Sequence, residues 1–130
     1  MTRGPRPRDT DTLAAIFAAA GVAHFAAPTV LHPVVPPWMA AWARPVVAVS
    51  GVAELAVSGA LLHPATRRRG AQGAAGLIAV FLVTHVDAAV RTRRDRARWI
   101  ERPTGVTLRL VGNTAFVAWA LTVARSAGPR

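Results

Sequence analysis

The chain alternates between apolar stretches of about 20 residues and short clusters of arginine. Two of the apolar stretches, 43–62 and 71–90, are long enough for a helix to cross the ~30 Å hydrocarbon core of a bilayer. All 16 basic residues are arginine, and most of them gather between the apolar stretches, at 3–8, 67–69 and 91–102. A soluble helical bundle needs a charged stripe along each helix, which these stretches lack. The pattern therefore predicts membrane-spanning helices.

The spacing of the apolar stretches predicts an all-α fold, a transmembrane four-helix bundle. We expect one membrane domain at 11–125, a disordered basic tail at 1–10 and a short tail at 126–130, with helices at 12–27, 44–62, 71–90 and 106–124. Trp38 and Trp42, in the Pro-rich loop 28–42, are expected at headgroup level. The first stretch is short for a span, and a signal peptide is the alternative interpretation of it.

Composition narrows the class of function. The net charge is +10, which by itself is compatible with nucleic-acid binding. A DNA-binding helix mixes basic and apolar positions within one turn, whereas this chain separates them by tens of residues. We therefore expect the lipid bilayer and a lipophilic small molecule as partners, and no nucleic acid. The chain has no cysteine, which excludes a disulfide, dithiol chemistry and an iron–sulfur cluster of its own.

Polar side chains inside the apolar stretches are the candidate functional residues. An ionisable group at mid-bilayer costs about 3 kcal/mol on insertion scales, so it usually has a partner and a function. Because neighbouring helices run in opposite directions, six such side chains are expected in the half of the membrane nearest the Pro-rich loop: His24, Glu54, His85, Asp87, Arg109 and Asn113.

Spacings of three and four residues place polar side chains on common helix faces. The predicted faces are formed by Ser50, Glu54 and Ser58, by Thr84, Asp87 and Arg91, and by Arg109 and Asn113. Gly51 and Gly59 lie beside the first face and are expected to allow close helix contact. His85 lies about 200° from Asp87 around the helix, so we do not expect both to point at one centre.

The candidate site can be interpreted in several ways. We expect the ligand-binding residues to be His24, Ser50, Glu54, Thr84, Arg109 and Asn113, and the candidate catalytic residues to be Glu54, Asp87 and His85. A structural role is the alternative. Glu54 would then pair with Arg109, or be protonated and hydrogen-bonded to Ser50 or Asn113, and Asp87 would pair with Arg91 or Arg94. The histidines and carboxylates are of the types that bind zinc or iron, but no two lie four residues apart, and no metal site is predicted.

Segments of the chain carry a family resemblance in a fixed order. They are GVAHFAAP at 21–28, VSGVAELAVSGALLHPATRRRGA at 49–71, GLIAVF at 76–81, RLVGN at 109–113, and Trp119. In this order the chain resembles the DoxX family of small four-helix membrane proteins. The most specific part is Ser-Gly-x-x-Glu followed by a helix that ends in x-Pro-x-Thr-Arg-Arg. The resemblance covers about residues 13–124.

The resemblance implies a multi-pass protein of the inner membrane with cytoplasmic termini. It also implies an accessory role in membrane redox reactions, with a quinone as the possible cofactor and another membrane redox protein as a possible partner. His24, Glu54 and Arg109 match polar positions that recur in the family, and Asn113 stands where Gln is common. The helix with Thr84 and its polar neighbours departs from the family pattern. The arginines divide equally between the two sets of loops, so charge alone leaves the orientation open.

Three functions remain open at this point. The first is a polar intramembrane pocket for a lipophilic molecule, a quinone or an isoprenoid, with Glu54 as its central group. The second is an enzyme that uses Glu54 and Asp87 for acid–base chemistry on a lipophilic substrate, in an isomerisation, cyclisation or epoxide opening. The third is a membrane scaffold without a ligand.

Overall fold

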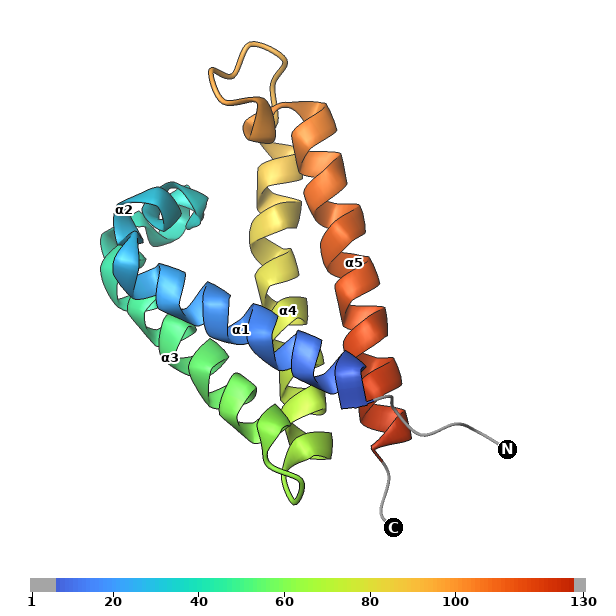
Figure 1. Ribbon diagram of the computed structural model, residues 1–130. Coiled ribbons are helices and arrows are strands. Elements are labelled where there is room, and N and C mark those ends of the chain that lie inside the picture. The colour runs from blue at the N-terminus through green and yellow to red at the C-terminus, as the bar shows by residue number, and fades with distance from the viewer. Residues whose placement is uncertain (1–6, 128–130) are drawn as a thin grey trace.

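The computed structural model describes residues 7–127, which form helices and short connections without a strand (Figure 1). The elements in chain order are α1 Pro7–Ala26, α2 Pro28–Leu31, η1 His32–Val34, η2 Pro37–Trp42, α3 Ala43–Leu62, α4 Arg67–Val90, η3 Trp99–Glu101 and α5 Pro103–Ser126, where η denotes a 3-10 helix. The expectation of an all-α fold is confirmed.

The long helices extend beyond the apolar stretches that predicted them. Residues 7–10, expected in a disordered tail, form the first turn of α1, and Thr10 is fully buried. The arginine cluster 67–69 is the first turn of α4 rather than a loop. Apolar residues mark the part of a helix that needs an apolar environment, whereas its backbone hydrogen bonds continue into the polar flanks. The rest of the two predicted tails, 1–6 and 128–130, lies outside the described residues.

Three helical segments are long and apolar enough to cross a membrane: Pro37–Leu62, Arg67–Val90 and Pro103–Ser126. Only 17–28% of their most apolar windows is buried inside the protein, so these helices present apolar surface outward. The helix α1 passes the same test only together with the Pro-rich segment after it, from which it is bent by 101°. The chain therefore has three candidate spans, or four if this bent pair counts as one.

The helices pair into two hairpins, α1 with α3 and α4 with α5, and the turn between α3 and α4 joins them. The hairpins meet near this turn and diverge toward the other end of the molecule (Figure 1). We call the first region the closed end and the second the open end. The start of α1 and the end of α5 both lie at the closed end, as the figure shows.

The hydrophobic core lies at the closed end. Leucine and phenylalanine side chains from α1 and α3 pack there against small residues, and the buried cluster contains Leu13, Ala14, Phe17, Leu61, Ala71, Ala74, Ala75, Ile78, Ala120, Val123 and Ala124. Its many alanines allow helix backbones to approach closely. The hydroxyl of Ser58 donates a hydrogen bond to the carbonyl oxygen of Ala14 at 2.8 Å, which ties α3 to α1.

Side-chain hydrogen bonds stabilise the turn between α3 and α4 at the closed end. Thr66 Oγ1 donates to the carbonyl oxygen of Ala60 at 2.9 Å, and Arg67 Nε donates to that of Leu61 at 3.2 Å. These bonds satisfy carbonyls that the last turn of α3 leaves without helical partners. A Cβ on Gly70 would lie 2.7 Å from the backbone nitrogen of Leu61, so only glycine permits this contact between α3 and α4.

Candidate functional site

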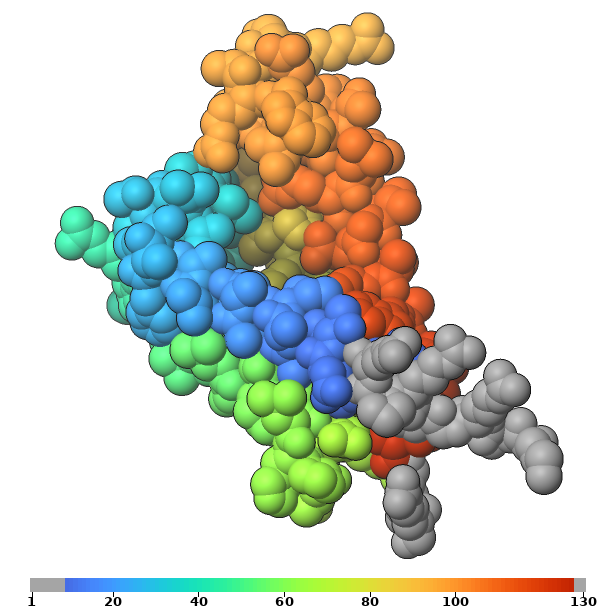
Figure 2. Space-filling model, viewed as in Figure 1, coloured from blue at the N-terminus to red at the C-terminus, as the bar shows by residue number. Residues whose placement is uncertain are grey.

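The protein surface is hollowed between α1 and α5 at the open end, with α4 behind (Figure 2). Two cavities occupy this region and follow one another along α4 and α5. The apolar cavity has a volume of about 290 Å³ and is lined by Ile16, Phe17, Ala20, Glu54, Ile78, Phe81, Gly112, Asn113 and Phe116. The basic cavity, nearer the open end, has a volume of about 340 Å³ and is bordered by residues 33–37 of the Pro-rich segment, by polar residues of α4, by the loop 91–102 and by Arg109.

Among the described residues, Glu54 is the one ionisable side chain that lines the apolar cavity, and it is 5% exposed. Its Oε2 lies 2.9 Å from Nδ1 of His24 on α1. The same nitrogen lies 2.8 Å from the carbonyl oxygen of Ala20, toward which its N–H has the better direction. The distance between Nδ1 of His24 and Oε2 of Glu54 is thus short enough for a hydrogen bond, but the direction of the N–H does not suit one. Among the described residues, Oε2 has no hydrogen-bond donor although it is fully buried.

Close approach of α1 and α3 brings His24 to Glu54. A Cβ on Gly51 would lie 2.7 Å from Cβ of His24, so the two helices can meet here only because residue 51 is glycine. A Cβ on Gly59 would meet nothing within 4 Å. Of the two glycines expected to allow helix contact, only Gly51 does so within this chain.

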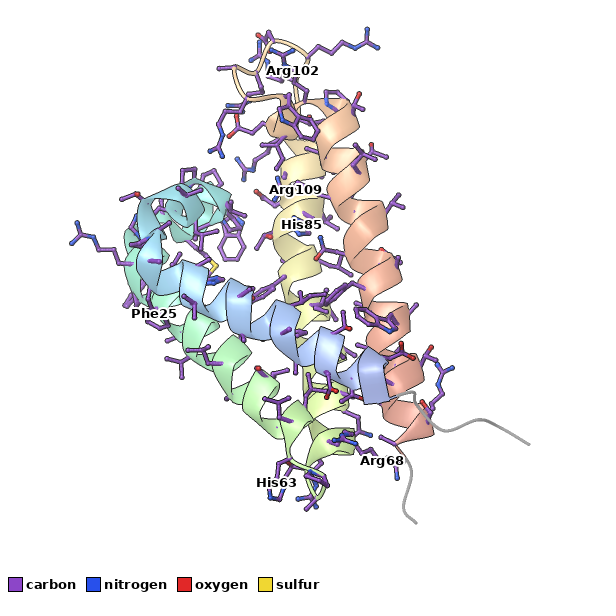
Figure 3. The ribbon with its side chains drawn as sticks, viewed as in Figure 1. Phe25, His63, Arg68, His85, Arg102 and Arg109 are labelled. Carbon is purple, nitrogen blue, oxygen red and sulfur yellow. The ribbon has the colours of Figure 1, made fainter. Side chains whose placement is uncertain are left out.

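The second polar group joins α4 to α5 (Figure 3). Arg109 Nη2 donates to Nδ1 of His85 at 2.8 Å, so the proton of this neutral imidazole is on Nε2. Asn113 Nδ2 donates to the carbonyl oxygen of Arg109 at 2.8 Å. His85 is buried and Arg109 partly buried, and both border the basic cavity.

Two further polar residues of α4 border the basic cavity. Asp87 forms an ion pair with Arg91 one turn later, with Oδ1 3.0 Å from Nε. The hydroxyl of Thr84 donates to the carbonyl oxygen of Phe81 at 2.7 Å, within its own helix. His85 and Asp87 border the same cavity although they lie far apart around the helix, and each has a different arginine as its partner.

A family model described as a domain of unknown function (DUF8561) matches residues 13–124. The chain belongs to this family. The match includes every residue that lines the two cavities. No curated protein and no solved structure matches the chain. The resemblance to the DoxX family stays a prediction.

The six polar residues expected to converge form two groups in this DUF8561 protein. One group is His24 with Glu54, within the first hairpin, and the other includes His85 and Arg109, within the second. The alternative pairing of Glu54 with Arg109 is not formed, because the hairpins diverge where these residues lie. Ser50 borders neither cavity, and His24 is not part of either lining. Among residues 7–127, no three His, Asp or Glu side chains lie together as metal ligands would.

Sequence reasoning did not find the aromatic lining of the apolar cavity. Phe17 and Phe116 line it as a contacting pair with ring centroids 6.1 Å apart, and Phe81 borders it from α4. Nothing separates these phenylalanines from lipid-facing ones in a helix that is apolar on all sides. Arg96 and Arg98, which border the basic cavity from the loop, were likewise missed because a loop arginine carries no positional signal.

Proposed function

We propose that this protein is an integral membrane protein that binds a lipophilic small molecule between its two helix hairpins. The observation that carries the proposal is the buried Oε2 of Glu54 at the wall of a mainly apolar cavity that Asn113 also lines. This oxygen lies 2.9 Å from Nδ1 of His24 but accepts no hydrogen bond from the described residues. An unsatisfied buried polar atom costs about 1–3 kcal/mol. A ligand hydroxyl or N–H at this position would remove that cost.

The shape of the cavity suits the head of an elongated apolar molecule. Its volume of about 290 Å³ is near the lower bound of roughly 300 Å³ for ligand pockets. A ring or a hydroxylated chain end fits such a space beside the contacting rings of Phe17 and Phe116, while the remainder of the molecule follows the apolar helix faces. A reduced quinone and an isoprenoid alcohol both combine a hydroxyl group with a long apolar chain.

The proposed setting is a four-helix transmembrane bundle in the inner membrane, with α1 as the fourth span and cytoplasmic termini. An even number of spans agrees with the position of the start of α1 and the end of α5 at the same end of the molecule. The resemblance to DoxX proteins supports a quinone as ligand and an accessory role in membrane redox reactions. The same resemblance supports a membrane redox protein as partner.

Acid–base catalysis by two carboxylates has no comparable support. Glu54 and Asp87 border different cavities, and Asp87 is paired with Arg91. A single substrate atom in one cavity would therefore meet only one of the two carboxylates. We accordingly propose ligand binding without a catalytic step.

The test compares the purified wild type with Glu54→Gln, which keeps the side-chain shape and replaces one oxygen by NH₂. Native mass spectrometry with solvent extraction identifies any retained molecule, and titration with a short-chain reduced quinone and with farnesol measures affinity. A buried polar atom left without its hydrogen bond costs about 1–3 kcal/mol, so affinity should fall at least about fivefold.

The matched control is Asp95→Asn, which removes a carboxylate from an exposed ion pair with Arg93 outside both cavities. It should bind both molecules as the wild type does. Equal affinity of the wild type and Glu54→Gln would contradict the proposal. A folded wild type that binds neither molecule would favour a scaffold, with the exposed apolar helix faces as contact surfaces.

A further inference from the structure

The charges that border the basic cavity do not balance. Four arginines face two carboxylates there: Arg91, Arg96, Arg98 and Arg109 against Asp87 and Glu101. Asp87 already forms an ion pair with Arg91. Among residues 7–127, none of the other three arginines forms an ion pair. The cavity therefore holds more positive charge than its own carboxylates neutralise.

Arg109 is the arginine of this group that lies within a candidate membrane span. Its side-chain hydrogen bond is to His85, an uncharged acceptor, and the charged groups that act on it most strongly are Glu101 and Arg98. An arginine inside a membrane-spanning helix is costly and usually has a compensating partner. In this chain the compensating negative charge is incomplete, which leaves room for an anion supplied from outside.

The donors around the cavity match a phosphate group. Guanidinium groups present pairs of N–H donors at the spacing of phosphate oxygens, and several arginines together hold phosphate more firmly than one. The neutral ring of His85 accepts from Arg109 at Nδ1 and also interacts with the side chain of Asn113, so the donors left for a ligand are those of the arginines. A neutral ligand would use few of these donors.

The basic cavity lies next to the apolar cavity along α4 and α5. On α5, Arg109 borders the basic cavity and Asn113 the apolar cavity, one helical turn or about 6 Å apart. On α4, His85 and Phe81 have the same relation. The basic cavity is also bordered by the loop 91–102, which lies between two candidate spans, where lipid headgroups are found. Residues 33–37 border it as well, where the bent pair ends and the candidate span Pro37–Leu62 begins.

We propose that the basic cavity binds the phosphate group of an anionic lipid whose apolar chain enters the apolar cavity. The ligand class is thus a phosphate ester of a long apolar alcohol. The lipid part of this proposal rests on the proposed function, whereas the phosphate site rests on the arginines alone. Arg98 and Arg109 are the residues that contact the phosphate, one from the loop and one from α5.

The experiment measures binding of farnesyl phosphate, farnesol and inorganic phosphate to the full-length protein in phosphatidylcholine nanodiscs. We expect farnesyl phosphate to bind at least about tenfold more tightly than farnesol, and free phosphate much more weakly than either. Arg109→Gln and Arg98→Gln should each lower the affinity for farnesyl phosphate about tenfold and leave that for farnesol unchanged. Arg125→Gln, an exposed arginine at the other end of α5, is the control and should change neither.

The outcomes separate this proposal from the previous one. Equal affinities for farnesol and farnesyl phosphate would overturn the phosphate site and leave the proposed function standing. Tight binding of inorganic phosphate, competing fully with farnesyl phosphate, would show a site for the free anion and overturn the lipid. Arg109→Gln removes the bond to His85 and could therefore prevent folding. In that case the result for Arg98→Gln decides whether the phosphate site exists. The Arg98 side chain forms no ion pair in the described part of the chain, so its removal should leave the fold intact.

Discussion

The two ends of the molecule are built from different residues and serve different purposes. At the closed end, leucine and phenylalanine pack against alanine, and a contact that only Gly70 permits brings α3 and α4 together. At the open end, each hairpin forms a polar pair from its own two helices. His24 contacts Glu54 in the first hairpin, and His85 contacts Arg109 in the second. Packing at the closed end leaves space toward the open end, so we expect stability and the proposed binding to respond to different substitutions. Phe17 and Ile78 are exceptions, because they belong to the core and also line the apolar cavity.

The largest effect is expected from Phe17→Ala. Phe17 is 3% exposed and contacts Phe116 of the other hairpin, so its removal leaves a cavity where the hairpins meet. A loss of about 3–5 kcal/mol is expected, measured by unfolding in detergent. Phe25→Ala is the control, because Phe25 is 50% exposed. Similar losses for both would mean that the closed end is not the stabilising region.

A second substitution tests helix contact at the closed end. Gly70→Ala places a methyl group against the backbone of α3 and should cost about 1–3 kcal/mol. Gly59→Ala puts the same methyl group into open space on α3. There the higher helix propensity of alanine should raise stability by up to about 1 kcal/mol. Opposite signs in the same unfolding assay would confirm the contact, and equal changes would argue against it.

The open end can be filled without disturbing the closed end. Gly112 lines the apolar cavity, and a Cβ there would meet nothing within 4 Å. Gly112→Leu should therefore change the free energy of unfolding by no more than about 1 kcal/mol. It should also abolish binding of farnesol, because the new side chain occupies the cavity. Retained binding would place the ligand elsewhere, and Gly76→Leu is the control at another uncrowded glycine.

The smallest effect is expected from Ser58→Ala, which removes one hydrogen bond between α3 and α1. Interhelical hydrogen bonds in membrane proteins contribute about 0.6 kcal/mol on average. Ser126→Ala removes a bond within a single exposed helical turn and should change stability less. A loss above about 2 kcal/mol for Ser58→Ala would show that the first hairpin depends on this bond.

The sequence predicted the helices well and their ends less well. Apolar stretches of about 20 residues determine where α3, α4 and α5 cross an apolar layer. They carry no information on how far each helix continues outside it, which is why the arginines at 67–69 and Thr10 were placed in loop or tail. The helices continue there because their hydrogen bonds form between backbone groups, whatever the hydropathy of the side chains.

The partners within the site could not be predicted from position alone. Depth in the membrane placed Glu54 and Arg109 at the same end, but the divergence of the hairpins separates them and leaves each with a histidine. That divergence depends on three-dimensional packing, including the contact at Gly70, which no single stretch of sequence reveals. The Asp87–Arg91 pair was foreseen as an alternative because it depends only on spacing within one helix.

The bend of 101° after α1 has a consequence for the membrane around the protein. Because the chain turns aside at Ala27, α1 has 20 residues where α4 and α5 have 24, a difference of about 6 Å in length. With α1 as the proposed fourth span, this hydrophobic mismatch in a thicker bilayer falls on α1, which must change its tilt or thin the lipid around it. A change of tilt would move α1 relative to α5, so under the proposed function bilayer thickness would alter the width of the opening between the two hairpins.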